Sequence, residues 1–266
     1  MYNKLKQSEN FFLLAGPCVI ESQEVMYQIA EELKRITSKL NIPFVFKASY
    51  KKANRTSIDS YTGVGLDEGL KILAKIKQDF DVQIVTDVHE TSEISAVAEV
   101  ADIIQIPAFL SRQTDLLREA GRTNKIVNIK KAQFMAGEDI ITAAEKVTST
   151  GNDKILLTER GTSFGYHNLV VDFRNFAIMH QAGFPVVYDV THSLQQPSIG
   201  KISGGTPENV PMMAKAALAT GYVSGLFIET HPDPLKALSD AKSMFELKSM
   251  EKLLTECIRI WNAKKN

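Results

Sequence analysis

Short apolar runs rich in Val, Ile and Phe alternate along this chain with longer stretches of helical period. The first run, FFLLAGPC at 11–18, reads as a buried strand, and the stretch at 23–40 that follows it reads as an amphipathic helix. One face of that helix would carry Val25, Ile29, Leu33, Ile36 and Leu40. The same alternation continues to the end of the chain and predicts a repeated strand–helix unit.

Eight runs resemble strands, and most are separated by helix-like or long connecting segments. They lie at 11–18, 43–50, 82–89, 102–109, 125–131, 154–160, 185–192 and 224–231. Near-continuous apolar strands between helices are typical of a parallel sheet covered on both faces. Eight such units in 266 residues match the size of a (β/α)8 TIM barrel. We therefore predict an α/β protein with a single barrel domain over 1–266, closed by a helix at roughly 235–262.

A doubly wound open sheet is the structural alternative to the barrel. Such sheets usually have fewer strands, and no Gly-x-Gly-x-x-Gly turn follows the first predicted strand here. The barrel remains the preferred interpretation.

Charge and cysteine content exclude several classes of function. Lys plus Arg equals Asp plus Glu, so no global basic field attracts nucleic acid or an acidic membrane surface. Two cysteines cannot form a disulfide framework and suit a reducing compartment. The N-terminus lacks the features of a signal peptide, and no run approaches the roughly 20 apolar residues that span a bilayer. We expect a cytoplasmic protein that binds neither nucleic acid nor membrane.

Polar residues gather where the predicted strands end, which is where barrel enzymes carry their chemistry. These positions are Cys18, Glu21, Lys47, Ser49, Asp87, His89, Lys130, Lys131, Glu159, Arg160, Asp189, His192, Glu229 and His231. Any one of them is explained by exposure at a chain turn. The whole set is hard to explain by packing, because Lys and Arg are seldom buried without a partner.

One group within this set is positive and suits phosphorylated substrates. It contains Lys47, Lys52, Arg55, Lys130, Lys131 and Arg160. Arg offers a planar fork that matches phosphate, and Lys supplies a point charge. A solvated loop explains Lys51 and Lys52 equally well when they are taken alone. Arg160 is more distinctive, because Gly161 after it allows close approach of backbone or ligand.

A second group contains metal-ligand types: Cys18, His192, Glu229 and Asp240. Thiolate, imidazole and carboxylate together suit a divalent ion such as Zn2+, Fe2+ or Mn2+. The barrel would bring the first three together, since they end strands one, seven and eight. Taken singly, Cys18 reads as a small buried hydrophobe and Asp240 as an acid on a helix surface. Cys257, in LLTECIRIW, is interpreted as helix core.

The motifs at the strand ends resemble a known family. They are AGPCVIES (15–22), FKASYKKANRTS (46–57), TDVHE (86–90), QIPAFL (105–110), NIKKAQF (128–134), ERGTSFGYHNLVVD (159–172), DVTHSLQ (189–195) and ETHPDP (229–234). In this order, from about 11 to 240, the chain is similar to the 3-deoxy-D-manno-octulosonate 8-phosphate synthases. The resemblance implies a (β/α)8 barrel, commonly a homotetramer, that condenses phosphoenolpyruvate with arabinose 5-phosphate. The product is a sugar acid of Gram-negative lipopolysaccharide.

The resemblance also implies roles for individual residues. It assigns phosphoenolpyruvate to Lys52, Lys130 and Arg160, with Lys47 close by, and arabinose 5-phosphate to Asn54, Arg55 and Thr56. Cys18, His192, Glu229 and Asp240 match the family's metal ligands. Within the set, Cys18, Lys52, His192 and Asp240 are the expected catalytic residues. Some members carry Asn at the Cys18 position and work without metal, so cysteine implies the metal-requiring group.

Two departures and several rivals accompany the resemblance. Ser is more usual where Thr56 stands, and 61–65 reads YTGVG where YRGPG is expected. The nearest rival is the related synthase that uses erythrose 4-phosphate, which carries Lys-Pro-Arg-Thr where this chain has 52–55 as KANR. Sialic-acid-type synthases, a non-catalytic sugar-phosphate-binding barrel and an aldolase or hydrolase with a Schiff base on Lys130 are more distant alternatives.

Overall fold

Eight parallel strands close into a barrel in the computed structural model, which describes residues 1–55, 57–165, 167–196 and 204–264. They are β1 (Phe12–Gly16), β2 (Phe44–Lys47), β3 (Gln83–Asp87), β4 (Ile103–Ile106), β5 (Ile126–Lys130), β6 (Ile155–Glu159), β9 (Val186–Asp189) and β12 (Gly225–His231). Each strand pairs in parallel with the next along the chain, and β12 pairs with β1, in register Phe12 to Gly225, to complete the cylinder. The predicted (β/α)8 barrel and all eight predicted strands are confirmed.

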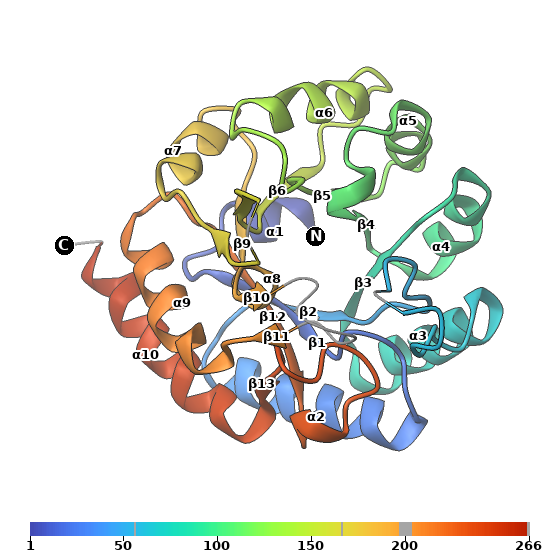
Figure 1. Cartoon of the computed structure of the whole chain (residues 1–266), viewed down its shortest axis with the longest axis vertical. Coiled ribbons are helices and arrows are strands. Elements are labelled where there is room, and N and C mark those ends of the chain that lie inside the picture. Colours follow the sequence, from blue (N-terminus) through green and yellow to red (C-terminus); the bar gives the residue numbers. More distant parts are fainter. Residues whose placement is uncertain (56, 166, 197–203, 265–266) are drawn as a thin grey trace.

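Helices surround the strands as an outer ring (Figure 1). They are α2 (Gln23–Lys39), α3 (Leu66–Phe80), α4 (Ile94–Val100), α5 (Thr114–Arg122), α6 (Asp139–Thr148), α7 (Arg174–His180), α9 (Val210–Ala219) and α10 (Met250–Ala263). One-turn helix α8 (Val190–Ser193) directly follows β9. At the start of α2, the Ser22 side chain accepts a hydrogen bond from the Val25 N–H, which satisfies a donor the helix leaves unpaired.

The prediction for the last helix was wrong at its start. Helix α10 begins at Met250, and the segment before it forms two 3-10 turns, η4 (Pro234–Lys236) and η5 (Leu247–Ser249), and a short strand β13 (Phe245–Glu246). Asp240 has a φ of 50°, a left-handed conformation that interrupts any helix. Asp240 is therefore a loop residue and not an acid on a helix surface.

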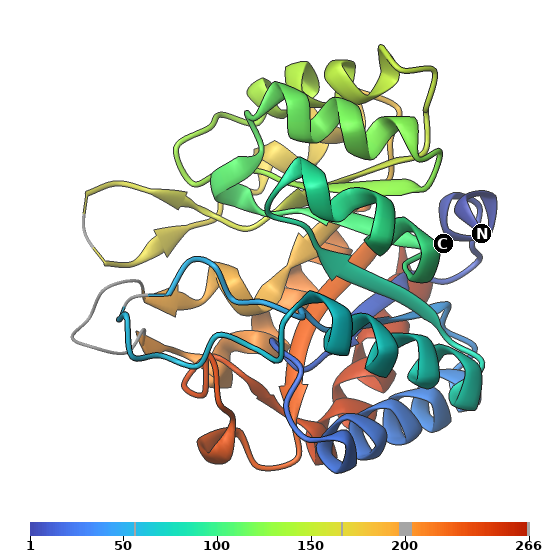
Figure 2. The same ribbon diagram turned by 90° about the vertical axis from the view of Figure 1, so that its right-hand side faces the viewer.

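Smaller elements decorate the ends of the strands. Strands β7 (Thr162–Ser163) and β8 (Leu169–Val170) form an antiparallel pair, as do β10 (Gln195–Gln196) and β11 (Gly204–Gly205). Three further 3-10 turns are η1 (Thr91–Glu93), η2 (Ala108–Leu110) and η3 (Pro207–Asn209). Figure 2 shows the β7–β8 hairpin projecting from the end of the barrel opposite to α1 (Tyr2–Lys6).

Side chains alternate along each strand between the barrel interior and the helix layer. On β1, Phe12 and Leu14 point into the barrel, whereas Leu13 and Ala15 join the larger core that lies under the helices. The inner cluster contains Phe12, Leu14, Val45, Val85, Ile103, Ile126, Leu156, Val187 and Phe227. It fills the half of the barrel nearer the strand N-termini with apolar side chains.

Two residues further along several strands, the same inward face becomes polar. Val45 is followed by Lys47, Val85 by Asp87, Ile103 by Gln105, Ile126 by Asn128, Leu156 by Thr158, Val187 by Asp189 and Phe227 by Glu229. The period of two places these polar residues together above the apolar layer. The barrel interior thus has an apolar lower half and a polar upper half that opens toward the C-terminal ends of the strands.

Glycine at the end of β1 is required by the closeness of the neighbouring strand. A Cβ atom on Gly16 would lie 2.1 Å from the Lys47 carbonyl oxygen, which is backbone and cannot move aside. The chain then continues through Cys18, whose backbone carbonyl accepts a hydrogen bond from Lys47. The approach of β1 to β2 therefore fixes where Cys18 lies.

The N-terminal helix α1 covers the apolar half of the barrel. Leu5 is 5% exposed and packs on the inner cluster, and the Tyr2 hydroxyl donates to the Ile155 carbonyl over 3.2 Å. Throughout the part of the chain that the structure describes, no helix has both the length and the apolar character to cross a membrane.

We expect Leu5→Ala to lower the free energy of unfolding by about 2–3 kcal/mol, because it removes a buried side chain and leaves a cavity under α1. Urea titration followed by circular dichroism measures the change. Leu235→Ala is the matched control, since Leu235 is 86% exposed, and it should leave the unfolding midpoint unchanged. Equal midpoints for the two variants would contradict the sealing role of α1.

Candidate active site

A small hollow of about 60 Å³ lies in the polar upper half of the barrel. Seven of the site residues predicted from the sequence line it: Lys47, Lys52, Asn54, Lys130, Arg160, His192 and Glu229. Ser49, Lys51, Asp87, His89 and Gln133 complete its polar wall. The lining comes from the ends of seven barrel strands and the loops that follow them, as barrel chemistry requires.

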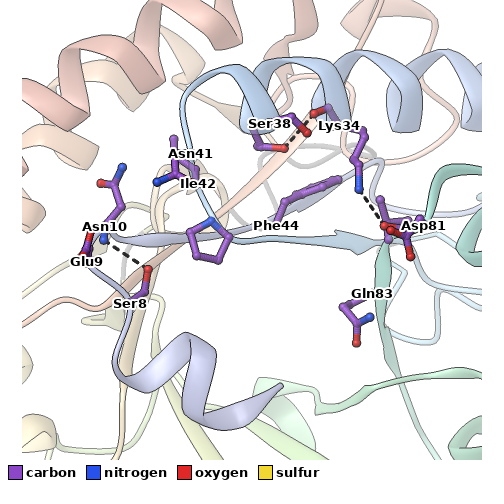
Figure 3. Close-up of a pocket in the computed structure, with 13 residues that line it drawn as sticks. Ser8, Glu9, Asn10, Lys34, Ser38, Asn41, Ile42, Phe44, Asp81 and Gln83 are labelled. Atoms are coloured by element: carbon purple, nitrogen blue, oxygen red, sulfur yellow. Dashed lines mark hydrogen bonds between the residues drawn. The ribbon is translucent and has the colours of Figure 1, made fainter.

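Two larger hollows occur elsewhere but lack this concentration of chemistry. One of about 370 Å³ lies at the opposite end of the barrel, between the segment after α1, the end of α2 and the turn before β3 (Figure 3). There Lys34 donates to the Asp81 backbone carbonyl, and the remaining lining is mostly short polar side chains. Another of about 530 Å³ lies between the segment after β5 and α7. The site is identified by its buried charged groups and not by volume.

Lys47 and Glu229 form a buried ion pair across β2 and β12. The Lys47 Nζ atom lies 2.6 Å from Glu229 Oε1, and both side chains are at most 3% exposed. Burial disfavours charge on both groups, but each ion offsets this for the other, so the pKa of Lys47 is raised and that of Glu229 is lowered. Both groups therefore stay charged at neutral pH.

Lys130, Asp189 and His192 form a second buried cluster. The Asp189 carboxylate lies 2.6 Å from Lys130 Nζ and 2.8 Å from His192 Nδ1, and it also caps the turn of α8 by accepting the His192 N–H. Burial opposes ionisation of Asp189, yet the charges of His192 and Lys130 hold its pKa well below the usual range. The carboxylate fixes the imidazole so that His192 Nε2 faces Glu229 Oε2 at 3.7 Å.

Arg160 brings a buried guanidinium to the pocket. It is 5% exposed, and its Nη2 atom reaches Gln195 Oε1 at 3.4 Å. Its Nη1 atom has no hydrogen-bond partner among the residues that the structure describes. Burial lowers the pKa of Arg160 from a very high value, and a guanidinium remains charged in proteins. A buried cation with a spare donor is suited to bind an anion.

Lys131 does not join the positive group that the sequence predicted. Its side chain is fully buried and turned away from the pocket, where it donates to the carbonyls of Ala132 and Met135 and lies 3.5 Å from Glu159. Burial lowers its pKa, against the effect of Glu159. Successive strand residues point to opposite faces, so Lys130 faces the site and Lys131 the helix layer.

Cys18 and Asp240 meet above the ends of β1 and β12. The Cys18 thiol lies 3.0 Å from Asp240 Oδ2, and Lys52 Nζ lies 2.9 Å from the sulfur and hydrogen-bonds the same Asp240 oxygen. Burial and the nearby Glu229 charge raise the pKa of the Cys18 thiol, whereas Lys52 holds the pKa of Asp240 low despite burial. The positively charged Lys52 therefore contacts two of the predicted metal ligands, Cys18 and Asp240.

Three of the four predicted metal ligands converge, and His192 lies outside that group. One ligand atom each from Cys18, Glu229 and Asp240 lie within 4.8 Å of one another. Glu229 Oε2 is buried and lacks a hydrogen-bond partner in the described part of the chain. The His192 imidazole faces this oxygen and has its other nitrogen held by Asp189, an arrangement typical of metal-binding histidines. A mixed thiolate, imidazole and carboxylate set suits Zn2+, Fe2+ or Mn2+.

The loop after β2 carries the remaining predicted residues. Asn54 lines the pocket and is exposed, and Arg55 Nη1 donates to the Lys52 carbonyl at 2.9 Å. Arg55 Nε has no hydrogen-bond partner among the described residues. Thr56 lies outside the described residues.

His89 lines the pocket, where burial favours the neutral form of its imidazole. Burial lowers the pKa of His89 against the opposing charges of Asp87 and Glu93. Glu93 accepts from the His89 N–H and from the Tyr50 hydroxyl, both at 2.8 Å, which fixes the turn that presents the ring. His89 is therefore mostly uncharged at neutral pH, where one ring nitrogen can donate a hydrogen bond and the other can accept one.

Sequence reasoning missed a set of buried amides and hydroxyls under the pocket. Gln105, Asn128 and Thr158 are at most 1% exposed and bond to one another. Their signal was present in the sequence, as polar residues at inward positions of strands that are otherwise apolar. A prediction based on titratable residues at strand ends does not include them, because amide and hydroxyl side chains do not titrate.

Comparisons with known proteins agree with this geometry. The family model described as the DAHP synthetase I family matches residues 5–263. A protein of Arabidopsis thaliana named 2-dehydro-3-deoxyphosphooctonate aldolase 1 is 53% identical over 98% of this chain and 91% of its own length. Proteins named 2-dehydro-3-deoxyphosphooctonate aldolase are 52% identical in Desulfatibacillum aliphaticivorans, over 94% of this chain and 92% of their own, and in Pisum sativum, over 98% and 91%.

Removing Lys47 should leave Glu229 as a buried charge without its main partner. We expect Lys47→Met to lower the free energy of unfolding by about 3–5 kcal/mol at neutral pH. The pKa of Glu229 is lowered in the folded wild type. Ionised Glu229 therefore stabilises the folded state at pH values above the pKa that it has in the unfolded chain, and this stabilisation is lost as pH falls. Without Lys47, burial raises that pKa, and the deficit of the variant should shrink in acid as Glu229 takes up a proton.

Urea titrations of both proteins from pH 5 to pH 8 measure this difference. The double variant Lys47→Met with Glu229→Gln is the control, because it removes both charges and should recover much of the lost stability. A deficit that stays constant with pH, or a double variant that is no more stable than Lys47→Met, would show that the ion pair does not set stability here.

Proposed function

The chain belongs to the DAHP synthetase I family, and from its relatives and its site we propose that it is a 3-deoxy-D-manno-octulosonate 8-phosphate synthase. It condenses phosphoenolpyruvate with D-arabinose 5-phosphate and water to give the eight-carbon sugar acid phosphate and inorganic phosphate. The observation that carries the proposal is identity of 52–53% over at least 94% of the chain to proteins named 2-dehydro-3-deoxyphosphooctonate aldolase.

The charges of the pocket support anionic substrates. Lys52, Lys130 and Arg160 are proposed to hold the phosphate and carboxylate of phosphoenolpyruvate, with Lys47 beside them. Arg160 is the strongest candidate, because its Nη1 donor is buried and lacks a partner in the described ranges. Asn54, Arg55 and Thr56 are proposed to bind the sugar phosphate from the loop after β2, as the family resemblance implies.

The reaction forms a bond between C3 of phosphoenolpyruvate and the aldehyde carbon of the sugar. Water adds at C2, and phosphate leaves by cleavage of its C–O bond. The site residues align the alkene face of phosphoenolpyruvate with the aldehyde of the sugar. This alignment lowers the activation free energy of the reaction, because the two bound substrates no longer lose entropy when they meet. Lys and Arg side chains neutralise the two phosphates and the carboxylate, and a proton donor such as His89 stabilises charge that develops on oxygen.

We propose that a divalent metal ion is bound by Cys18, His192, Glu229 and Asp240. The unpartnered Glu229 oxygen and the Asp189-oriented imidazole support this assignment. Such an ion would supply orientation and polarisation of the sugar carbonyl. In this proposal Cys18, His192 and Asp240 act through the ion, and Lys52 acts on the substrate that lies next to it.

The related synthase that uses erythrose 4-phosphate is the second candidate. The match to the DAHP synthetase I family is compatible with this second reaction, since the barrel and the anion site suit both reactions. The names of the relatives and the KANR sequence at 52–55 favour arabinose 5-phosphate. We further propose a cytoplasmic homotetramer that serves lipopolysaccharide synthesis, with free Cys18 and Cys257 consistent with a reducing compartment.

Phosphate release from phosphoenolpyruvate tests the reaction and the metal together. We expect turnover with arabinose 5-phosphate, little with erythrose 4-phosphate, loss of turnover in EDTA and recovery with Mn2+ or Zn2+. Turnover with erythrose 4-phosphate alone would establish the second candidate. Turnover that EDTA leaves unchanged would keep the family and remove the proposed role of the Cys18 site.

Lys52 supplies a test of the metal site that does not depend on activity. The Lys52 ammonium group is hydrogen-bonded to the Cys18 sulfur and to an Asp240 oxygen, so a metal ion that binds these two atoms must displace it. We expect Lys52→Met to tighten Co2+ binding about tenfold, as the loss of one competing charged hydrogen bond would predict. The cobalt–thiolate absorption band in the near ultraviolet reports the affinity.

Lys51→Met is the matched control for this measurement. Lys51 is the preceding lysine of the same loop, and its Nζ atom lies near Glu90 and Glu93, at 3.8 and 3.6 Å. This variant should bind Co2+ as the wild type does. A Lys52→Met protein with unchanged Co2+ affinity would argue against competition at Cys18 and Asp240, and absence of the thiolate band would argue against the Cys18 ligand itself.

A further inference from the structure

A chain of hydrogen bonds crosses the barrel interior directly beneath the pocket. Thr158 Oγ1 lies 2.6 Å from Asn128 Oδ1, Asn128 Nδ2 lies 2.8 Å from Gln105 Oε1, and Gln105 Nε2 lies 2.7 Å from Asp87 Oδ1. Ser49 Oγ contacts the second Asp87 oxygen at 2.5 Å. The chain joins four neighbouring strands, from β6 through β5 and β4 to β3, and it ends on a carboxylate.

The chemistry of the carboxylate gives this chain one direction. An ionised Asp87 only accepts, so Gln105 must turn its NH2 group toward it and its carbonyl toward Asn128. Asn128 then turns its NH2 group toward Gln105 and accepts from the single hydroxyl proton of Thr158. Each donor therefore points toward Asp87, and each bond polarises the next in the same sense.

Packing does not explain why these positions are polar. Asn128 and Thr158 are fully buried, and Gln105 is 1% exposed. Leucine or valine would fill the same space without the desolvation cost of amides and hydroxyls. The residues two positions earlier on these strands, Ile103, Ile126 and Leu156, are apolar and pack in the inner cluster.

Asp87 is the charged end of the chain and faces the pocket floor. The charged and titratable groups that act on it are Lys47 from β2, Lys130 from β5 and His89 from the turn after β3. Burial opposes ionisation of Asp87, but Lys47, Lys130, His89 and the Ser49 hydroxyl lower its pKa to about 2. Lys47 and Lys130 are the two lysines at the base of the pocket, and each already pairs with a second carboxylate, Glu229 and Asp189 respectively.

We propose that Asn128 is a positioning residue, which holds Gln105 so that its amide fixes the Asp87 carboxylate in the wall of the pocket that binds phosphoenolpyruvate. The inference rests on the proposed function for the identity of the anion. Asn128 does not line the pocket, so its effect reaches the substrate only through Gln105 and Asp87. Breaking the chain frees Gln105 to turn its carbonyl toward Asp87, which repels the carboxylate and loosens the floor of the pocket.

The test uses Asn128→Leu, a substitution of similar volume that removes both hydrogen bonds. We expect KM for phosphoenolpyruvate to rise about tenfold, the effect of losing one hydrogen bond to a charged group. KM for arabinose 5-phosphate should stay within about twofold, since its proposed ligands lie on the loop after β2. Calorimetry without the sugar should give the same loss of phosphoenolpyruvate affinity. Thr158→Val, which keeps the shape of the side chain, should act in the same direction more weakly.

Asn152→Leu is the matched control. Asn152 is also a buried amide, and its Nδ2 atom donates to the carbonyls of Gly121 and Lys125, at 3.1 and 2.8 Å, before the start of β6 and far from the pocket. This variant should lower the unfolding midpoint and leave both KM values unchanged. The comparison separates loss of a buried amide in general from loss of the chain to Asp87.

Several results would overturn the role of Asn128. These are wild-type affinity for phosphoenolpyruvate in Asn128→Leu, an equal rise in both KM values, or the same rise in Asn152→Leu. If Asn128→Leu does not fold, wild-type affinity in Thr158→Val has the same meaning. A wild-type protein that binds no phosphoenolpyruvate overturns the proposed function and this inference with it, whereas normal wild-type binding with an unaffected variant overturns the inference alone.

Discussion

Balance of buried charge at the upper end of the barrel is the constraint on which the rest of the site depends. Four cations, Lys47, Lys52, Lys130 and Arg160, share this space with four carboxylates, Asp87, Asp189, Glu229 and Asp240. A single buried ion without a partner would cost several kcal/mol, so each group is tolerable only because the others lie beside it. The strands that supply them must therefore hold a fixed register, and the apolar half beneath them provides the packing that fixes it.

This balance also explains how a pocket rich in lysine remains compact before it meets an anion. Lys47, Lys52 and Lys130 each lie against a carboxylate, so an incoming phosphate would exchange one anionic partner for another and need not desolvate a free ammonium group. Arg160 differs, because one of its donors is buried without a partner among the described residues. An anion bound at Arg160 would satisfy that donor, and its remaining oxygens would lie near lysines that already pair with carboxylates.

How much of this was predictable follows from the physics of each element. The eight strands and the closed barrel follow from periodicity, and the gathering of Lys47, Lys130, Arg160 and Glu229 follows from closure of the barrel. The start of the last helix and the setting of Asp240 did not, because a left-handed backbone and two 3-10 turns depend on tertiary contacts. The sequence prediction grouped Lys131 with Lys130 because it considered their charge alone and did not consider that successive strand residues point to opposite faces. The same alternation, applied to Gln105 and Asn128, would have revealed the buried polar layer.

The two cysteines show why burial alone does not identify a functional residue. Cys18 and Cys257 are both buried, and burial raises the pKa of both thiols, that of Cys257 to about 12. Cys257 lies on α10 within the apolar layer under the helices. Cys18 lies after the end of β1, where a carboxylate and an ammonium group contact its sulfur. The polar partners that surround a thiol, set by where the strand ends, separate a metal-ligand candidate from a residue of the core.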